Sequence, residues 1–276
     1  MSHEVQRLTL PEVDLAYTER GSGEETVVFS HSYLVDHRHF DAQIDHLAGR
    51  YRVLAYDHRE HGQSRLHTAT PELYDVDALV DDAIAFIERA AAAPCHFVGL
   101  STGGFVGLRI ALSRPDLLKS LVLMDTSAEL EPLYRRLKYE AMFLVLRFFG
   151  FGPLMGSVMG IMFSPDTLGD SARRDEMALW RERMTANDRT ALIRFGRAIF
   201  RRDSVVERLG EITVPTLVIV GEDDNAQPIA RHQVMAQGIP GARLEVIPGA
   251  GHLSTIDQPE RVNEVLATFL EALGVS

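Results

Sequence analysis

Apolar residues recur along this chain in two alternating patterns, short β-type runs and longer segments with helical spacing. The β-type runs predict about eight strands, at residues 4–9, 13–18, 27–31, 52–57, 95–100, 120–125, 216–221 and 243–248. Residues 77–92, 105–115 and 259–273 instead place apolar side chains three and four positions apart, which predicts amphipathic helices. Strands that alternate with helices favour an α/β fold, with a mostly parallel eight-stranded sheet flanked by helices.

This alternation stops between about Ser127 and Arg208, where the pattern is helical throughout, and the strands resume after Val214. We therefore expect one α/β core domain formed by residues 1–126 and 209–276. Residues 127–208 are expected to form a helical cap inserted after the sixth strand.

The composition narrows the classes of function that remain open. With a formal net charge of -11, the chain is not expected to bind nucleic acid or a membrane. A single cysteine, Cys95, excludes an internal disulfide, and residues 1–17 lack a basic region followed by an apolar run; both favour a cytoplasmic protein. The most apolar stretch, residues 141–163, contains Arg147 and Pro153, which argues against a membrane span.

One glycine-rich stretch carries the first candidate for chemistry. The residues GLSTGG at 99–104 place Ser101 between a predicted strand and a predicted helix. This matches GxSxG, in which a sharp turn exposes the serine and small neighbours let the backbones pass. The N-terminus of the following helix supplies N–H groups for a developing oxyanion. The alternative is a glycine-rich turn with an incidental serine, but the strand-turn-helix context favours a nucleophile.

A serine hydroxyl is a weak nucleophile, so it needs a neighbouring base and an acid that orients the base. In this architecture the acid and then the histidine follow the serine along the chain. His252 fits because it lies on a glycine-rich loop after the last predicted strand. The earlier His31, His58 and His61 better fit loop or structural roles.

Three aspartates are candidates for the acid. Asp223 and Asp224 are adjacent in the loop after residues 216–221, so only one is expected to face the histidine. Asp125, at the end of an earlier strand, is the third candidate. We favour Asp224.

With these residues in place, the sequence resembles the α/β-hydrolase superfamily over nearly its whole length outside the helical insertion. The resemblance lies in GLSTG around Ser101, YDHREHGQS at 56–64, GEDDNAQP at 221–228 and PGAGHLSTIDQPE at 248–260. The family's spacing from Gly221 to an aspartate and then a proline supports Asp224. The resemblance also implies that the backbone N–H groups of Tyr33 and Thr102 form the oxyanion hole, and that no cofactor or metal is used.

Two positions depart from the family pattern. Ser32 follows His31 where relatives usually have glycine, and this version resembles 3-oxoadipate enol-lactonases more than lipases. Glu60 stands where relatives commonly have glycine in Arg-Gly-His-Gly. If the backbone there needs a positive φ, Glu60 introduces strain.

A serine at the turn separates this chain from haloalkane dehalogenases and epoxide hydrolases of the same fold, which resemble it but use aspartate there. The resemblance implies acyl transfer, and we expect hydrolysis of a carboxylic ester or lactone of a small, largely apolar substrate. The same triad also serves carbon-carbon bond hydrolases and cofactor-free perhydrolases or haloperoxidases. Hormone receptors of this fold keep the triad as ligand-binding modules, so they remain a further alternative.

The helical insertion offers further candidates for substrate contact. Residues 141–163 hold four of nine methionines and five of thirteen phenylalanines, which pack the cap onto the core, with a few expected to touch substrate. One cap arginine could bind a substrate carboxylate, although such residues usually lie on solvated helix faces. The candidates are the arginines at 173, 174, 181, 183, 189, 194, 197, 201 and 202, among which Arg181 beside Trp180 stands out.

A metal hydrolase is the remaining alternative, since histidines and aspartates crowd two segments. They are Asp36, His37, His39 and Asp41 in the first segment, and Asp57, His58 and His61 in the second. Neither matches a zinc spacing such as HExxH, so we expect no metal site.

Overall fold

The computed structural model describes residues 4–67 and 74–274. The remaining residues of the two predicted core segments, 1–3, 68–73 and 275–276, lie outside this description. Within the described residues, nine strands form one sheet, in the spatial order β1-β2-β4-β3-β6-β7-β8-β9, with β5 paired to β2. The strands are β1 (Val5–Thr9), β2 (Val13–Arg20), β3 (Thr26–Ser30), β4 (Arg52–Tyr56), β5 (Arg65–Leu66), β6 (Cys95–Leu100), β7 (Leu118–Met124), β8 (Thr216–Gly221) and β9 (Arg243–Ile247).

The mostly parallel sheet is confirmed. From β4 through β3, β6, β7 and β8 to β9 every pair is parallel, whereas β1, β4 and β5 pair antiparallel with β2. All eight predicted strands are present, with ends shifted by at most two residues. The ninth, β5, has two residues and therefore too short an apolar pattern to be seen in the sequence.

Helices cover both faces of the sheet. Those of the core are α1 (Asp41–Leu47), α2 (Val76–Phe86), α3 (Thr102–Ser113), α9 (Ile229–Gly238), α10 (Ser254–Asp257) and α11 (Pro259–Ala272), with short turns η1 (His37–Phe40), η2 (Ile87–Ala91) and η3 (Pro115–Leu117). The predicted helix at 77–92 is therefore α2 followed by the π-helical turn η2.

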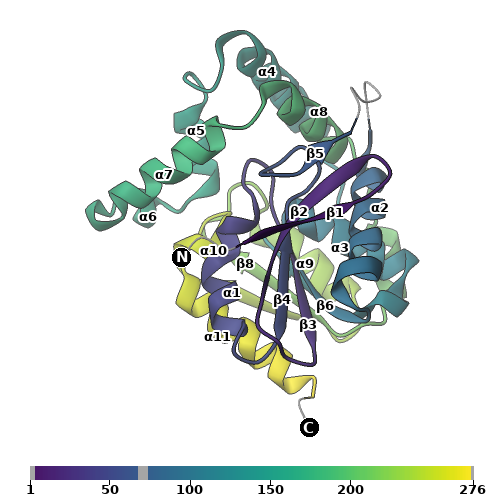
Figure 1. The fold of residues 1–276 in the computed structure, drawn as a ribbon. Helices are drawn as coiled ribbons and strands as arrows, with labels where there is room; N and C mark the ends of the chain where they lie inside the picture. The colour runs from purple at the N-terminus through teal and green to yellow at the C-terminus, as the bar shows by residue number, and fades with distance from the viewer. Residues whose placement is uncertain (1–3, 68–73, 275–276) are drawn as a thin grey trace.

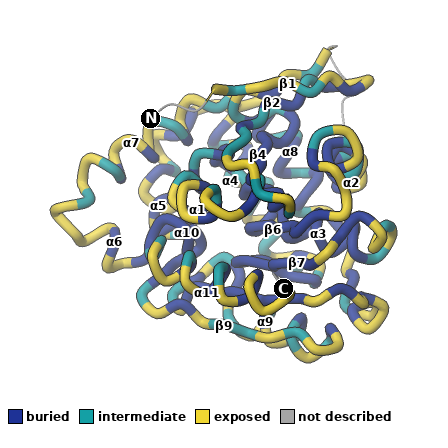
Figure 2. The backbone as a smooth tube through the Cα atoms, turned by 60° about the horizontal axis from the view of Figure 1, so that its bottom comes forward, coloured by how far each residue is buried: buried dark blue, intermediate teal, exposed yellow. Residues whose placement is uncertain are grey.

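Two hydrophobic cores lie on opposite faces of the sheet, because successive strand residues point to opposite sides. Val27 and Phe29 pack in one core with α1 and α11, whereas Val28 packs in the other with α2, α3 and α9. The central strand β6 is buried throughout and β7 at every residue except Lys119, and both are mostly dark blue in Figure 2. The carboxyl ends of these strands are where a site is expected in such a sheet.

Between β7 and β8 the chain forms helices only. They are α4 (Leu133–Phe149), α5 (Met155–Met162), α6 (Pro165–Gly169), η4 (Ser171–Arg173), α7 (Arg174–Thr185), α8 (Arg189–Phe200) and η5 (Val206–Glu211). In Figure 1, α4 to α8 gather beyond one end of the sheet. We interpret this segment, residues 127–208, as the cap. In the described part of the chain, no helix has both the length and the apolar character needed to cross a membrane.

Candidate active site

Ser101 lies at the sharp turn between β6, which ends at Leu100, and α3, which begins at Thr102. Its backbone has φ 53° and ψ -103°, a strained conformation for a residue with a side chain. Two bonds hold the turn: the Ser101 N–H donates to the Met124 carbonyl at 2.8 Å, and the Thr126 hydroxyl donates to the Ser101 carbonyl at 2.7 Å. The predicted strand-turn-helix geometry is therefore confirmed.

The glycines around Ser101 are required by close backbone contacts. A Cβ atom at Gly99 would overlap the Gly103 carbonyl, and one at Gly103 would overlap the carbonyl of Ser30 on the neighbouring strand β3. At Gly104 a Cβ would overlap the Thr126 side chain. Glycine at these positions lets α3 begin directly against the sheet, with Ser101 above the strand end.

His252 and Asp224 meet at the ends of β9 and β8. The His252 Nδ1 atom lies 2.9 Å from Asp224 Oδ2. The other oxygen, Oδ1, accepts the N–H groups of Ala226 and Gln227 at 2.8 and 2.9 Å, which fixes the carboxylate in its loop. Because an ionised carboxylate can only accept, Nδ1 carries the proton, and Nε2 of the neutral ring is left as the base.

Ser101 and His252 line one small cavity of about 100 Å³ under the helical segment. The lining residues are Ser32, Tyr33, Leu34, Ser101, Phe105, Tyr139, Met142, Phe143, Val158, Ile161, Met162, Ile199, Phe200, Ala226, Gln227 and His252. The structure thus gathers Ser101, His252 and Tyr33 at one cavity, with Asp224 behind His252 and Thr102 next to Ser101 in the first turn of α3. The walls are mostly apolar.

The other two candidate acids lie elsewhere. Both oxygens of Asp125 are engaged, by the Gly221 N–H at 2.8 Å and the Ser254 hydroxyl at 2.5 Å. Burial, together with the nearby charge of Asp224, raises the pKa of Asp125 to about 8. Asp223 is half-buried, and its backbone N–H bonds to the Ala250 carbonyl. Of the three, Asp224 is the one bonded to the histidine.

The loop after β3 places the Tyr33 backbone. His31 Nε2 accepts the His58 N–H at 2.8 Å, so Nδ1 carries the ring proton and donates to the Ser32 carbonyl at 2.6 Å. That carbonyl belongs to the same planar peptide as the Tyr33 N–H, so the bond also orients the N–H. His31 and His58 thus have structural contacts, in line with the sequence analysis.

Sequence reasoning missed a contact between this loop and the cap. The Tyr33 hydroxyl donates to the Leu192 carbonyl of α8 at 2.8 Å, and the ring stacks on Phe195 with centroids 6.0 Å apart. A second link joins the histidine loop to the end of α5, where the Leu253 N–H donates to the Met162 carbonyl at 2.8 Å. No local sequence pattern marks either bond.

The two expectations for cap side chains have different outcomes. Met142, Phe143 and Met162, from the methionine- and phenylalanine-rich stretch, line the cavity, as expected for a few of these residues. Among the described residues that line it, there is no arginine. Five of the candidate cap arginines bond instead to carboxylates, a hydroxyl or backbone carbonyls, and they are Arg173, Arg194, Arg197, Arg201 and Arg202.

The arginine that packs on Trp180 is not the adjacent Arg181 that stands out in the sequence. Trp180 is buried, and the cation over its ring is Arg183, with the guanidinium carbon 4.7 Å from the ring centroid. Arg181 is exposed on α7. Residues three apart on a helix are neighbours, whereas adjacent residues diverge by 100° around the axis.

The histidine and aspartate cluster holds a loop together. Ligand atoms of Asp36, His37 and Asp57 lie within 4.8 Å of one another. However, Asp57 accepts the His37 backbone and ring N–H groups at 2.9 and 2.7 Å and the Gln63 N–H at 2.8 Å. Asp36 accepts from the Arg38 guanidinium. These carboxylates already have partners that fix the loops after β3 and β4.

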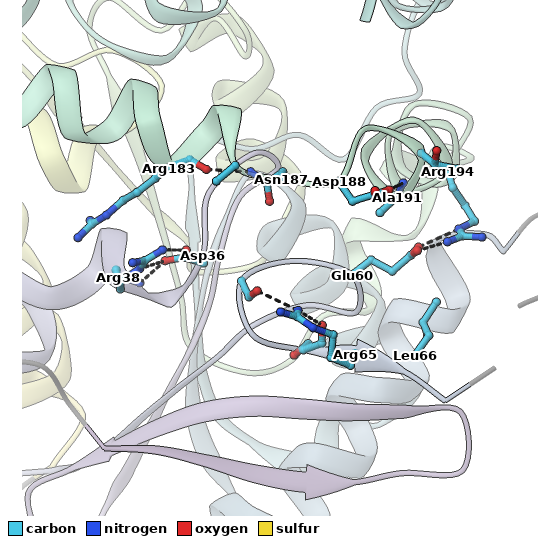
Figure 3. A pocket seen from close by; sticks show the side chains of 14 residues that line it. Asp36, Arg38, Glu60, Arg65, Leu66, Arg183, Asn187, Asp188, Ala191 and Arg194 are labelled. Carbon is cyan, nitrogen blue, oxygen red and sulfur yellow. Dashed lines mark hydrogen bonds and ion pairs between the residues drawn. The ribbon is translucent and has the colours of Figure 1, made fainter. Parts of the chain in front are cut away.

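Glu60, the unexplained departure in the sequence, joins the core to the cap. Its φ is 62°, so the expected strain is present. The carboxylate accepts two bonds from the Arg194 guanidinium of α8 and one from the Tyr74 hydroxyl at 2.8 Å. Figure 3 shows Glu60 and Arg194 facing each other in a second cavity, of about 650 Å³, whose described lining includes neither Ser101 nor His252.

Arg194→Ala is expected to lower the free energy of unfolding by about 1–3 kcal/mol, because it leaves the Glu60 carboxylate, which is 7% exposed, without its cation. Denaturant unfolding measures this change. Arg181→Ala, on an exposed face of α7, is the matched control and should change it by less than about 0.5 kcal/mol. Equal effects of the two variants would contradict the role assigned to this pair.

Comparison with known proteins identifies the family of this chain. A profile described as alpha/beta hydrolase fold matches residues 25–259. The chain therefore belongs to the α/β-hydrolase family. Relatives are named as a putative carbamate hydrolase and as enol-lactonases, so a hydrolase is the class of enzyme that these names support.

Three relatives illustrate this similarity. A putative carbamate hydrolase, RutD, of Stutzerimonas stutzeri is 30% identical over 83% of this chain and 84% of its own length. The 3-oxoadipate enol-lactonase 1 of Acinetobacter baylyi is 27% identical over 90% and 89%. The crystal structure of the enol-lactonase from Burkholderia xenovorans superposes with a TM-score of 0.85, at 26% identity, over 94% of this chain and 97% of that one.

Proposed function

We propose that this protein is a serine hydrolase that cleaves a carboxylic ester or lactone of a small, largely apolar substrate through an acyl-enzyme. The observation that carries the proposal is the meeting of Ser101, on its strained turn, and the His252–Asp224 pair at one apolar cavity. Ser101 is the nucleophile, His252 the general base and Asp224 the residue that orients it. The N–H groups of Tyr33 and Thr102 hold the oxyanion.

The proposed reaction has two steps. His252 Nε2 takes the Ser101 proton as Oγ attacks the carbonyl carbon, and the N–H groups stabilise the negative oxygen. The histidine then protonates the leaving alkoxide and an acyl-serine remains; the alcohol of an ester departs, whereas that of a lactone stays attached to the acyl group. Water attacks this ester while His252 again takes a proton, and the acid is released as Ser101 regains its hydrogen. The scheme needs no cofactor or metal.

The cavity supports a neutral substrate. The described lining residues include no arginine or lysine, so a carboxylate placed there would lose hydration without gaining a cation. This favours simple esters or lactones over an acid such as an enol-lactone intermediate with a free carboxylate. The substrate itself is the proposed partner; nucleic acid is not expected at a net charge of -11, and a cytoplasmic location is proposed from the free Cys95.

The test is a substrate panel with p-nitrophenyl esters of short and medium acyl chains, a neutral γ-lactone, a phenyl carbamate and a β-diketone. Hydrolysis of the esters or lactone, with an acyl adduct on the Ser101 peptide in rapidly quenched samples, supports the proposal. Turnover of the diketone alone would favour a carbon-carbon bond hydrolase. Binding without turnover of any compound would favour a receptor, and either result would overturn the proposal.

The pH dependence of kcat/KM is expected to show an acid limb above pH 6.5, since only the neutral His252 ring can take a proton. Burial alone lowers the pKa of His252, but the charge and hydrogen bond of Asp224 outweigh burial and leave the pKa raised. Activity is therefore lost as the pH falls through this raised value. A midpoint well below 6.5 in a kcat/KM profile would contradict the assignment.

A further inference from the structure

One cap helix exposes an apolar surface that no described part of the fold covers. Seven of the eleven exposed large hydrophobic side chains among the described residues lie on α4 or just before it. They are Leu130, Leu133, Tyr134, Leu137, Leu144, Phe148 and Phe149, with between 50% and 74% of each exposed. We call this set the α4 stripe. Such clustering marks an interaction site, because monomeric proteins scatter exposed apolar residues singly.

Apart from Phe149, the stripe is separate from the face that holds α4 to the protein. Phe143 and Leu146 are buried, and Tyr139, Met142 and Phe143 line the cavity that contains Ser101. At 100° per residue, these positions lie opposite the arc that runs from Leu133 through Leu144 to Phe148. The helix is thus apolar on two sides, one facing the cavity and one facing solvent.

Basic residues flank the stripe on both sides. On the same helical projection, Lys138 lies between Tyr134 and Phe149 at one edge, and Arg147 and Arg136 lie beyond Glu140 at the other. The one acidic residue of α4, Glu140, accepts bonds from Arg197 and Arg201 of α8, so its charge is compensated. The surface of α4 is therefore locally positive in a chain whose net charge is -11.

We propose that the α4 stripe docks on an anionic lipid surface. An apolar arc of leucine and phenylalanine with lysine and arginine at its edges is the arrangement of helices that lie in the plane of a membrane interface. The long basic side chains can reach the headgroups while the stripe enters the apolar boundary. This goes beyond the proposed hydrolysis and does not depend on it.

A second copy of the chain fits the same stripe less well. A twofold contact between two α4 helices, parallel or antiparallel, brings one flank against a flank of the partner helix. Because both flanks carry cations, like charges would meet across the contact, which is unfavourable. An anionic surface instead pairs with both flanks at once.

Docking on a membrane differs from what the net charge of -11 led us to expect. Charges separated by more than about 10 Å are screened at ordinary ionic strength, so the local charge of α4 decides attraction at contact. Residues of α4 also line the cavity that contains Ser101. Docking would therefore bring a lipid surface close to the helix that covers this cavity.

The experiment is vesicle flotation with the Ser101→Ala protein, so that binding is measured without hydrolysis of the lipid. We expect it to float with phosphatidylcholine–phosphatidylglycerol vesicles and much less with pure phosphatidylcholine. Leu137→Ser/Phe148→Ser should lower the partition coefficient by about tenfold or more, because both side chains leave the lipid. Lys138→Glu/Arg147→Glu should lower it by a similar factor on the anionic vesicles only.

The matched control is Leu168→Ser/Leu179→Ser, which removes exposed leucines from α6 and α7 and should leave binding unchanged. Failure of the parent protein to float, or equal binding of the α4 variants, would overturn the proposal. Light scattering tests whether a second copy of the chain binds the stripe instead. If the parent protein forms a concentration-dependent dimer, does not bind vesicles, and loses the dimer in Leu137→Ser/Phe148→Ser, the stripe is a dimer contact. None of these outcomes depends on ester hydrolysis.

Discussion

Ser101→Ala is expected to lower kcat for p-nitrophenyl ester hydrolysis by roughly 10⁴- to 10⁶-fold, with an unchanged fold. Removing Oγ removes the only atom proposed to bond to the acyl group, so the remaining rate reflects water attack helped by the oxyanion hole. The backbone bonds from the Ser101 N–H to Met124 and from Thr126 to the Ser101 carbonyl do not involve Oγ and are retained.

Steady-state kinetics and circular dichroism measure the activity and the fold. Ser113→Ala is the control, because this serine lies at the end of the same helix, its hydroxyl bonds to the Arg109 carbonyl, and it is not among the residues that line the cavity. Its activity should stay within about twofold of wild type, in line with its distance from the chemistry. Comparable activity of Ser101→Ala and wild type would remove Ser101 from the mechanism.

Asp224→Asn is expected to lower kcat by about 10⁴-fold, and Asp125→Asn by far less. In Asp224→Asn the amide takes the place of Oδ2 and offers an N–H to Nδ1, so the ring proton moves to Nε2. The nitrogen that serves as the base, Nε2, is then already protonated and cannot accept the proton of Ser101. Asp125 bonds to Gly221 and Ser254 and not to the ring, so its loss leaves this tautomer intact.

Kinetics of the two variants side by side decide between the candidate acids that the sequence left open. Because Asp125 is fully buried, its variant needs a stability measurement, and kcat should be compared at a temperature where both proteins are folded. A large loss in Asp125→Asn with little loss in Asp224→Asn would reverse the assignment.

The strands of the sheet could be predicted because each strand is marked by a pattern among residues that are neighbours in the sequence. Each strand from β6 to β9 is bounded by turn residues and carries a short apolar run, which sets its position within two residues. The two-residue β5 has no such pattern, and it pairs with Val13 and Asp14 of β2, which are distant in sequence. The π-helical turn η2 continues directly from α2, so the sequence shows the two only as one helix. The candidate site was found similarly, from the order of Ser101, Asp224 and His252 along the chain.

The contacts that could not be predicted join residues far apart in sequence. The Tyr33 hydroxyl meets a carbonyl 159 positions away, and Glu60 meets Arg194 across 134 positions. Glu60 looked only like a strained departure, because the sequence does not show that α8 brings a guanidinium to it. Likewise, the apolar composition of α4 did not reveal which of its faces is exposed.

Tyr33 connects the proposed oxyanion hole to the cap. Its backbone N–H belongs to the proposed oxyanion hole, and its hydroxyl is bonded to the Leu192 carbonyl on α8. An outward movement of α8 would break the hydroxyl bond and free the Tyr33 side chain, while the peptide keeps its bond from His31 to the Ser32 carbonyl. The position of α8 and the freedom of the Tyr33 side chain are therefore linked equilibria, so a ligand that stabilises the closed cap also restrains this side chain.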